Sequence, residues 1–413
     1  MLTGLLGEKL GHSYSPAIHA MLGNDNYQLF EVAPDDLATF LSRPDLDALN
    51  VTIPYKEAVR PYLAEESPAA RAIGAVNSLV RNADGRWMGH NTDFDGLAYL
   101  LDALAGDVAG KKCLILGGGG TAKTAHAVLA DRGAGEILHI VRHDGISYAD
   151  LPAHRDARWI INTTPVGMYP QAPAGLVHPA DFPQLEGVLD VIYNPLRTAL
   201  VYEAQRLGIP ALGGLAMLVA QAVYAHGYFT GQAPLVDQVA TIYQRLRAER
   251  ENIILIGMPG VGKTSLGQAL AADLGRPFVD LDAAFAQAHG PAGDYIRSHG
   301  EAAFRRLETD LARQVGQESG QVIACGGGIV TRSENDLLLR QNGRVYHLTR
   351  PLADLATDDR PLSQGGRALD RLWANRQALY EAFADRTLSC TDFTAALTAI
   401  KEDFFADTRF ERP

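Results

Sequence analysis

Gly257-Met258-Pro259-Gly260-Val261-Gly262-Lys263-Thr264-Ser265 is the stretch that decides the fold of the second half of the chain. It fits the phosphate-loop pattern G-x-x-x-x-G-K-[ST], with an apolar run typical of a buried strand at 253–256 and a helical pattern at 266–272. Glycines let successive N–H groups point at phosphate oxygens, and the start of the helix adds partial positive charge. The pattern predicts that Lys263 reaches the β- and γ-phosphates of a nucleotide and that the Thr264 hydroxyl binds Mg²⁺.

The composition around this loop is that of an ordinary globular protein. A chain of 413 residues with 47% hydrophobic and 21% charged residues predicts two to three domains. The net charge of −11 argues against a nucleic-acid partner, although small anions need only a local Arg or Lys. Three dispersed cysteines suit a reducing cytosol, the start of the chain lacks signal-peptide features, and the interrupted apolar stretch at 211–229 predicts a buried helix. We therefore expect a cytoplasmic protein without a nucleic-acid or membrane partner.

The first 110 residues contain polar groups that follow predicted strands. Ser13 and Ser15 lie before a helix opened by Pro16, where their hydroxyls can bind a polyol or carboxylate or simply cap the helix. Lys56 follows a strand that ends near residue 53, and Asp93 lies on a later polar segment. A Lys and an Asp from separate loops would form a proton-transfer pair if they met in space, whereas a solvated Lys is the ordinary alternative.

The next region predicts a dinucleotide-binding sheet. A strand at 111–116 leads into a turn and helix in which Gly117, Gly119 and Ala122 occupy the positions of G-x-G-x-x-[GA]. The following strand ends at Arg142, which favours the 2′-phosphate of NADP, while Asp144 leaves NAD open. Later strands at 159–161 and 187–193 fit a doubly wound sheet, and 213–228 reads as an apolar helix.

Together these segments resemble shikimate dehydrogenase over about residues 1–247. The resemblance rests on the segments GHSYSP at 11–16, NVTIPYK at 50–56, GAVN at 74–77, NTD at 91–93 and MLVAQ at 217–221. It implies a substrate-binding domain over 1–96 that a helix at 213–247 completes, and a Rossmann-like NADP-binding domain over 97–212.

The resemblance also implies roles for single residues. Lys56 and Asp93 match the family's catalytic pair, with Lys56 acting on the hydroxyl proton as the C5 carbonyl and alcohol interconvert. The matching cofactor loop keeps only the Arg of the family's usual pattern, since residues 141–143 read Val-Arg-His. The implied substrate-binding residues are Ser13, Ser15, Thr52, Asn77, Asp93, Tyr193 and Gln221. The implied NADP-binding residues are Gly117, Gly118, Gly119, Gly120, Thr121, Arg142, Val191 and Gly214.

The second half carries further polar motifs after the phosphate loop. Asp280 and Asp282 fall two apart on a predicted strand, where one can serve Mg²⁺ and the other a substrate hydroxyl, or one can cap the next helix. Three glycines at 326–328 follow a strand and would let a ligand touch the backbone. The polar loop at 358–366 predicts a lid, and a helix at 371–384 carries Arg376.

This half resembles shikimate kinase over about residues 252–400. Besides the phosphate loop, the resemblance rests on DLD at 280–282, FRRLE at 304–308, GGG at 326–328, RPL at 360–362 and NRQALY at 375–380. It departs from the family in a short segment at 355–359 that lacks an Arg, and in Ala378, which replaces a Pro.

The implied chemistry is transfer of the ATP γ-phosphoryl group to the 3-hydroxyl of shikimate. Asp282 would accept the hydroxyl proton, while Lys263 and Arg360 would stabilise charge on the transferring group. The implied shikimate-binding residues are Asp282, Arg305, Gly327 and Arg376. The implied ATP-binding residues are Gly260, Val261, Gly262, Lys263, Thr264, Ser265 and Arg360, with Thr264 and Asp280 at Mg²⁺.

The sequence thus predicts an α/β chain with a dehydrogenase half and a phosphate-loop kinase half. The leading hypothesis is reduction of 3-dehydroshikimate with NADPH followed by phosphorylation of shikimate with ATP. A second hypothesis makes the C-terminal half a nucleotide-binding regulatory module without turnover. A third makes the first half a quinate/shikimate dehydrogenase that works in the oxidative direction. Oligomeric state is left open.

Overall fold

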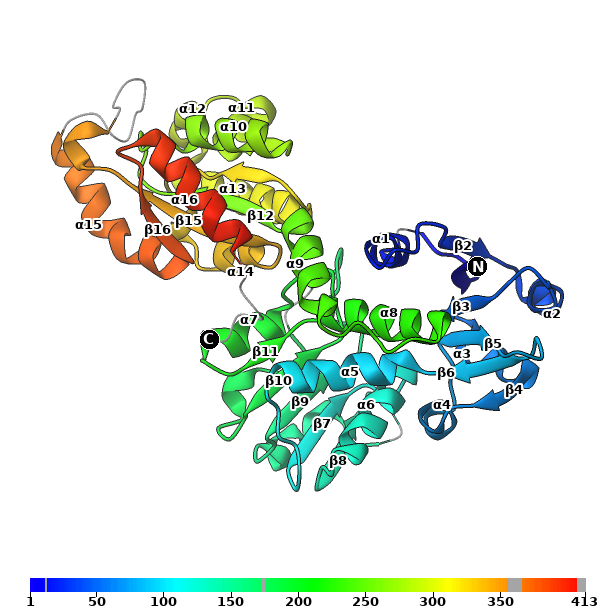
Figure 1. Ribbon diagram of the computed structural model, residues 1–413. Coiled ribbons are helices and arrows are strands. Elements are labelled where there is room, and N and C mark those ends of the chain that lie inside the picture. Colours follow the sequence, from blue (N-terminus) through cyan, green and yellow to red (C-terminus); the bar gives the residue numbers. More distant parts are fainter. Residues whose placement is uncertain (12, 144, 173–174, 356–365, 407–413) are drawn as a thin grey trace. The chain divides into compact units, whose positions relative to one another are not determined.

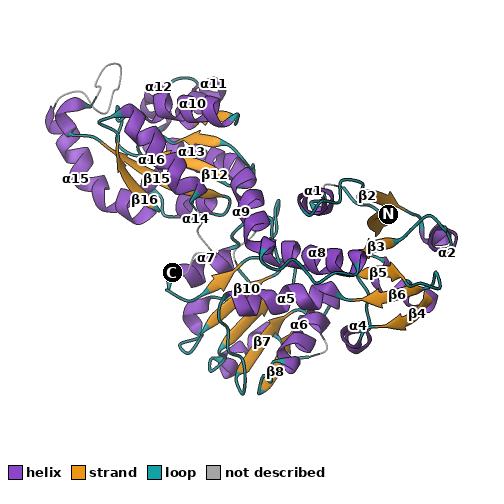
Figure 2. Ribbon diagram, viewed as in Figure 1, coloured by secondary structure: helices purple, strands orange, loops and turns teal. Residues whose placement is uncertain are grey.

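The strands form three β-sheets in the residues that the computed structural model describes, which are 1–11, 13–143, 145–172, 175–355 and 366–406 (Figure 1). Helices and strands alternate along most of the chain (Figure 2), so the α/β class expected from the sequence is confirmed. The chain divides into two compact units. The first contains Met1–Asn194 and Glu203–Gln244, and the second contains Pro195–Tyr202 and the described residues from Arg245 onward.

The first unit begins with a six-stranded sheet in the order β2-β1-β3-β5-β6-β4. Its paired strands are parallel except for β3–β5 and β5–β6, which are antiparallel. Leu49 lies opposite Leu79, and Asn50 lies opposite Ser78. Because successive residues of a strand point to opposite faces, the leucines pack into one core while Asn50 and Ser78 share the other face. The strands are β1 (Thr3–Gly7), β2 (Gln28–Glu31), β3 (Ala48–Val51), β4 (Leu63–Glu66), β5 (Ser78–Arg81) and β6 (Trp87–His90).

The second sheet of this unit is fully parallel, with the order β11-β10-β9-β7-β8. The chain leaves β7 toward β8 on one side and then returns to β9 on the other side. The carboxyl ends of β7 and β9 therefore flank the point where the strand order reverses, which is where such sheets bind ligands. The strands are β7 (Lys112–Leu116), β8 (Glu136–Ile140), β9 (Trp159–Asn162), β10 (Gly187–Asp190) and β11 (Ala211–Leu212).

Helix α8 (Leu215–Thr230) joins the two sheets of the first unit by packing into both of their cores. Ala216 and Met217 belong to the core of the parallel sheet, together with α5 (Thr92–Ala103), against which α8 packs (Figure 1). Ala225 and Phe229 belong to a core with β1 and β3. The other helices before β12 are α1 (Ser15–Met21), α2 (Leu37–Leu41), α3 (Tyr55–Ala58), α4 (Pro68–Ile73), α6 (Gly120–Asp131), α7 (Ala199–Arg206) and α9 (Gln238–Arg250).

The single helix expected over 213–247 is two helices in the structure, α8 and α9. Helix α8 ends at Gly231, whose φ of 66° is the left-handed conformation that closes helices and that other residues adopt only at a cost. Helix α9 then runs through most of the 244–252 segment. The domain limits drawn from the sequence remain predictions.

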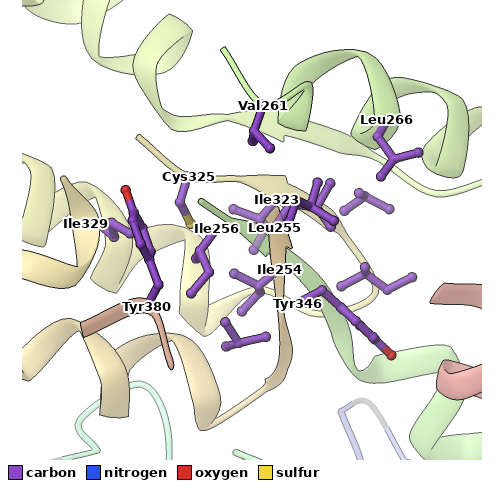
Figure 3. Close-up of a cluster of buried hydrophobic side chains, with 14 of the residues drawn as sticks. Ile254, Leu255, Ile256, Val261, Leu266, Ile323, Cys325, Ile329, Tyr346 and Tyr380 are labelled. Carbon is purple, nitrogen blue, oxygen red and sulfur yellow. The ribbon is translucent and has the colours of Figure 1, made fainter. Parts of the chain in front are cut away.

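The second unit is built on a parallel five-stranded sheet in the order β13-β14-β12-β15-β16. Its central strand β12 is fully buried, and Figure 3 shows Ile254, Leu255 and Ile256 among the apolar side chains that surround it. The strands are β12 (Asn252–Ile256), β13 (Phe278–Asp280), β14 (Val322–Ala324), β15 (Gly343–Thr349) and β16 (Arg386–Ser389). The helices are α10 (Lys263–Leu274), α11 (Leu281–His289), α12 (Ala292–His299), α13 (Glu301–Gln317), α14 (Glu334–Arg340), α15 (Gly366–Phe383) and α16 (Phe393–Phe405).

Short 3-10 turns complete the described elements: η1 (Pro34–Asp36), η2 (Arg60–Tyr62), η3 (Tyr148–His154), η4 (Pro179–Asp181), η5 (Ile329–Thr331) and η6 (Leu352–Asp354). No helix within the described ranges has both the length and the apolar character needed to cross a bilayer.

Candidate active sites

The first candidate site is centred on Lys56 and Asp93, which meet in the structure. The Nζ of Lys56 donates a hydrogen bond to Oδ2 of Asp93 at 2.6 Å, and the two side chains are 31% and 19% exposed. Lys56 lies on α3 just after β3, and Asp93 lies in the first turn of α5. The sequence placed these residues on separate segments without showing that they meet. Their partial exposure leaves the pair open to a ligand; the catalytic role itself stays a prediction.

Neighbouring backbone contacts hold the pair in place. Asn91 caps α5 by accepting a hydrogen bond from the N–H of Phe94 at 3.3 Å, and its amide donates to the carbonyl of Ala75 at 2.9 Å. The carbonyl of Lys56 accepts from the N–H of Val76 at 2.8 Å, so the same loop supports both ends of the ion pair. The Asp93 carboxylate in the first turn is also favoured by the helix dipole.

Asn77 presents a fixed amide beside this pair. Its Oδ1 accepts hydrogen bonds from the N–H of Thr92 at 2.6 Å and from the Thr92 hydroxyl at 3.2 Å, and the residue is 3% exposed. Among the described residues nothing accepts a hydrogen bond from its Nδ2. The amide can therefore donate to an oxygen of a bound ligand.

The remaining predicted substrate residues lie on four different elements. Ser15 is the first residue of α1 rather than a loop residue, and Ser13 Oγ accepts its N–H at 3.2 Å. Neither serine caps the helix, because Tyr14 occupies the N-cap position without a side-chain capping hydrogen bond. The ring of Tyr193 meets that of Tyr14 edge to face at 5.7 Å, and burial raises the pKa of Tyr193, so its phenol remains neutral. Gln221 lies on α8 and donates to the carbonyl of Leu218 at 2.9 Å.

Thr52 lies between β3 and Lys56, and its carbonyl accepts the N–H of Tyr55 at 2.9 Å. This short turn carries the chain from the buried strand to the ion pair. The structure thus joins Lys56 to Asp93 directly and places Asn77 beside them through Thr92. The contacts given above for the serines, Thr52, Tyr193 and Gln221 are made with other residues, and Tyr193 lies against Tyr14, between the two serines.

The glycine-rich turn after β7 fits a dinucleotide. Gly117 has a φ of 118°, and a Cβ there would lie 2.7 Å from Oγ1 of Thr163. A Cβ on Gly119 or Gly120 would meet nothing within 4 Å, so this side of the turn is open where α6 begins. An open helix N-terminus with uncovered N–H groups is the arrangement that binds a pyrophosphate. Gly118 and Thr121 belong to the same turn and first helical turn.

Arg142 follows β8 and is exposed, as a group that receives a 2′-phosphate must be. Asp144, on which the NAD alternative rested, lies outside the described residues. Gly214 and Val191 come into close backbone contact, because a Cβ on Gly214 would lie 2.0 Å from the carbonyl oxygen of Val191. These two segments follow β11 and β10, at the same edge of the sheet as the glycine-rich turn.

The second candidate site surrounds the phosphate loop. Lys263 opens α10, is 8% exposed, and donates from Nζ to the carbonyls of Gly257 and Met258 at 2.9 and 3.0 Å. The ammonium group thus lies inside the ring that the loop forms. Val261 anchors the loop in the hydrophobic core, while Gly260, Gly262, Thr264 and Ser265 line a cavity.

Asp280 and Asp282 are not on one strand, as the sequence pattern predicted. Strand β13 ends at Asp280, which caps α11 by accepting the N–H of Ala283 at 3.1 Å, and Asp282 is in the first turn of that helix. Asp280 can accept that N–H because its side chain is short and its extended backbone turns the carboxylate toward the start of the helix. Its other oxygen accepts from the Thr264 hydroxyl at 2.7 Å, so both oxygen ligands predicted for Mg²⁺ are adjacent.

Arg305 and Glu308 face the cavity from one side of α13. Arg305 donates to Glu308 at 2.7 Å and to Glu301 at 3.2 Å. Burial raises the pKa of Glu308, and the adjacent guanidinium offsets part of this effect. A Cβ on Gly328 would lie 2.2 Å from the Arg305 guanidinium, so the glycine lets this group lie directly against the loop.

The carbonyl of Gly327 is held from the other side by α15. It accepts a hydrogen bond from Arg376 at 3.0 Å and one from the Tyr380 hydroxyl. Glu308 and Tyr380 have structural roles here that the sequence did not assign. The Arg305–Glu308 spacing of three on a helix was the available signal, since such residues share a face.

These residues enclose one cavity of about 710 Å³. The phosphate loop forms one part of its wall, and Asp280, Asp282, Arg305, Gly327 and Arg376 form another. Arg360, predicted to contact the transferring phosphoryl group, and most of the predicted lid lie outside the described residues.

Comparison with known proteins finds a family match for each half of the chain. Residues 259–403 match the family model for shikimate kinase, and residues 5–79 match that for the shikimate dehydrogenase substrate binding domain. A shikimate dehydrogenase (NADP(+)) of Clostridium perfringens is 35% identical over 267 residues, which cover 60% of this chain and 98% of that protein.

Solved structures agree with this match. The fold is similar to that of a chorismate mutase/shikimate 5-dehydrogenase fusion protein from Clostridium acetobutylicum, with 35% identity and a TM-score of 0.56 over 59% of this chain and 96% of that one. It is also similar to a quinate dehydrogenase from Corynebacterium glutamicum in complex with NAD, with 27% identity and a TM-score of 0.54 over 59% and 99% of the two chains.

Proposed function

The chain belongs to the shikimate dehydrogenase family and carries a shikimate kinase domain as well, and we propose that it catalyses two consecutive reactions on one carbon skeleton. The first reduces 3-dehydroshikimate to shikimate with NADPH. The second transfers the γ-phosphoryl group of ATP to shikimate. The product of the first site is then the substrate of the second, as in the biosynthetic route to chorismate and the aromatic amino acids.

The proposal for the first reaction rests on the 2.6 Å contact between Lys56 and Asp93. A bound reduced nicotinamide would supply the hydride, and the substrate oxygen would then need a proton. Lys56 would donate that proton, with Asp93 orienting its ammonium group. Asn77 would donate to a substrate oxygen and so fix the ring. Gly119, Gly120 and the start of α6 would hold the pyrophosphate.

We expect Arg142→Ala to raise the KM for NADPH by about 10- to 100-fold, the value of one or two charge-assisted hydrogen bonds to a phosphate. Steady-state kinetics with NADPH and with NADH provide the measurement. The KM for NADH should change little, because NADH has no 2′-phosphate. Arg142→Lys keeps the charge but not the bidentate geometry, so its KM for NADPH should lie between those of the wild type and Arg142→Ala. Equal changes for both cofactors would contradict the assignment.

The proposal for the second reaction rests on the one cavity that joins the phosphate loop to Asp282, Arg305 and Arg376. Thr264 and Asp280 are hard oxygen ligands of the kind that Mg²⁺ prefers when it also binds a nucleotide phosphate. Lys263 would turn from its loop carbonyls toward the phosphates, and the two arginines would bind the substrate carboxylate. Asp282 would accept the proton of the attacking hydroxyl.

One incubation tests the proposal as a whole. The purified chain with 3-dehydroshikimate, NADPH and MgATP should yield shikimate 3-phosphate, followed by mass spectrometry. Without ATP the product should stop at shikimate, and without NADPH there should be no product. Accumulation of shikimate in the complete mixture would contradict the kinase half and favour a regulatory nucleotide-binding domain.

A second candidate for the first site is oxidation of quinate. The similarity to a quinate dehydrogenase in complex with NAD motivates it. The ratio of kcat/KM for shikimate with NADP⁺ to that for quinate with NAD⁺ separates the two. We expect this ratio to exceed one by a large factor, because Arg142 favours the phosphorylated cofactor.

A further inference from the structure

Behind the first candidate site lies a buried chain of hydrogen bonds that begins at α1 and ends at Asn77. Asn50 is its centre and is 5% exposed. Its Oδ1 accepts from the Tyr27 hydroxyl at 2.8 Å and lies 3.2 Å from Nε2 of His19. Its Nδ2 donates to Ser78 Oγ at 3.1 Å. Ser78 is fully buried and donates to Oδ1 of Asn77 at 3.3 Å.

The direction of these hydrogen bonds is fixed from one end. The N–H of Thr92 can only donate, so the atom of Asn77 that lies 2.6 Å from it must be the carbonyl oxygen. Ser78 Oγ lies 3.3 Å from the same oxygen and also 3.3 Å from Oγ1 of Thr92. When Ser78 donates its one proton to Asn77, it accepts from Asn50 through Nδ2. The oxygen of Asn50 then faces two donors, Tyr27 and His19.

The far end of the chain is consistent with this direction. His19 must carry its proton on Nε2 to donate to Asn50, and its Nδ1 has no hydrogen-bond partner among the described residues. Its ring is stacked between Tyr27 at 4.0 Å and Phe229 at 5.7 Å. Burial lowers the pKa of His19 to about 3, so the ring is neutral and has one proton to donate. Tyr27 also forms a hydrogen bond with Ser15, another predicted substrate residue.

We propose that Asn50 and Ser78 are positioning residues that act together with Thr92 to hold the Asn77 amide so that its N–H donors face the substrate. They occupy directly opposed positions on the antiparallel strands β3 and β5, which explains why their side chains meet. Neither is proposed to touch the substrate. If the Asn77 amide rotated, its oxygen would face a substrate hydroxyl and its N–H groups would face Ser78 and Thr92. The inference rests on the proposed dehydrogenase function, because it concerns the substrate site of that reaction.

The test is a double-mutant cycle in shikimate oxidation with NADP⁺. We expect Ser78→Ala to lower kcat/KM for shikimate about tenfold, mainly through KM, without changing the KM for NADP⁺. In the Asn77→Ala background the same substitution should have almost no effect, because the amide that Ser78 orients is gone. Equal losses of kcat/KM in both backgrounds would overturn the proposal.

Two further variants separate positioning from stability. Thr3→Ala removes another fully buried hydroxyl from the same sheet, one that accepts from Asn24, and should lower the melting temperature without the loss in kcat/KM. Asn50→Asp keeps the shape but replaces the donor with an acceptor. Ser78 would then donate to the new carboxylate instead of to Asn77, and kcat/KM should fall at least as far as in Ser78→Ala.

A measurement that does not depend on catalysis distinguishes a failure of the positioning role from a failure of the proposed dehydrogenase function. The side-chain amide resonances of Asn77, followed by NMR of the full chain, should shift in Ser78→Ala and stay unchanged in Thr3→Ala. A wild-type chain that failed to oxidise shikimate would contradict the proposed function. Unchanged Asn77 resonances in Ser78→Ala would contradict the positioning role, whatever the activity.

Discussion

Lys56→Ala is expected to lower the rate of 3-dehydroshikimate reduction by about 10³-fold, within the range that a positioned proton donor contributes. When hydride adds to the carbonyl carbon, the π electrons of the C=O bond move to the oxygen, and without Lys56 that oxygen has no adjacent acid. Asp93 cannot substitute, because a carboxylate that loses its ammonium partner is an acceptor and not a donor. The measurement is the steady-state oxidation of NADPH. The loss should appear in kcat, since binding of the cofactor does not depend on Lys56.

Lys111→Ala is a matched control, because Lys111 also forms ion pairs, with Asp107 and Glu186, away from the site. It should leave reduction unchanged. ATP consumption with added shikimate should be the same in Lys56→Ala as in the wild type. A folded Lys56→Ala protein that also lost phosphorylation would contradict the assignment of the two reactions to separate sites.

Lys263→Ala is expected to lower phosphorylation of shikimate by about 10³-fold while reduction of 3-dehydroshikimate stays unchanged. The ammonium group is buried within the phosphate loop, where its charge acts in a medium of lower polarizability than water. In the transition state it would stabilise the charge that spreads over the transferred phosphoryl group. ATP consumption that depends on shikimate is the measurement.

The control for this variant is Lys401→Ala, which removes a lysine paired with Asp273 on the outside of the same unit. Its kinase activity should equal that of the wild type. ATP affinity should fall in Lys263→Ala as well, because the same group contacts the ground-state phosphates. Retention of full phosphorylation by Lys263→Ala would mean that another cation performs this role and that the phosphate-loop assignment is wrong.

The parts of the fold that follow from local pattern could be predicted from the sequence. The phosphate loop and the glycine-rich turn are each encoded within about ten residues, because phosphate binding needs consecutive N–H groups at a strand-to-helix junction. The α/β class and the membership of the shikimate dehydrogenase family are confirmed, and residues 259–403 match the shikimate kinase model as expected. The roles of individual site residues stay predictions.

Local pattern was misleading where a single residue ends a strand or a helix. Asp280 and Asp282 alternate as strand residues would, yet Asp280 caps a helix that begins at the next residue. The sequence contained both signals, and the capping hydrogen bond ends the strand at Asp280 instead of at Asp282. The helix expected over 213–247 was divided at Gly231 for a similar reason, since one left-handed residue ends a helix whatever the apolar pattern on either side.

Contacts between distant segments could not be predicted. The contact between Lys56 and Asp93 depends on how two strands and a helix cap are arranged. The chain of hydrogen bonds from His19 to Asn77 depends on the register of β3 against β5. A shift of one residue in that register would send Asn50 and Ser78 to opposite faces. Such information is stored in the packing of the whole sheet and not in any one segment.

Helix α8 packs into the cores of both sheets of the first unit, and this affects how the unit opens locally to solvent. Amide groups in its middle exchange with solvent only when both cores open together, so α8 should be among the last segments to take up deuterium. Gln221 lies between the two sets of anchoring residues. The substrate site therefore opens only in the slowest cooperative opening of the unit. Any substitution that destabilises either core should increase amide exchange around Gln221.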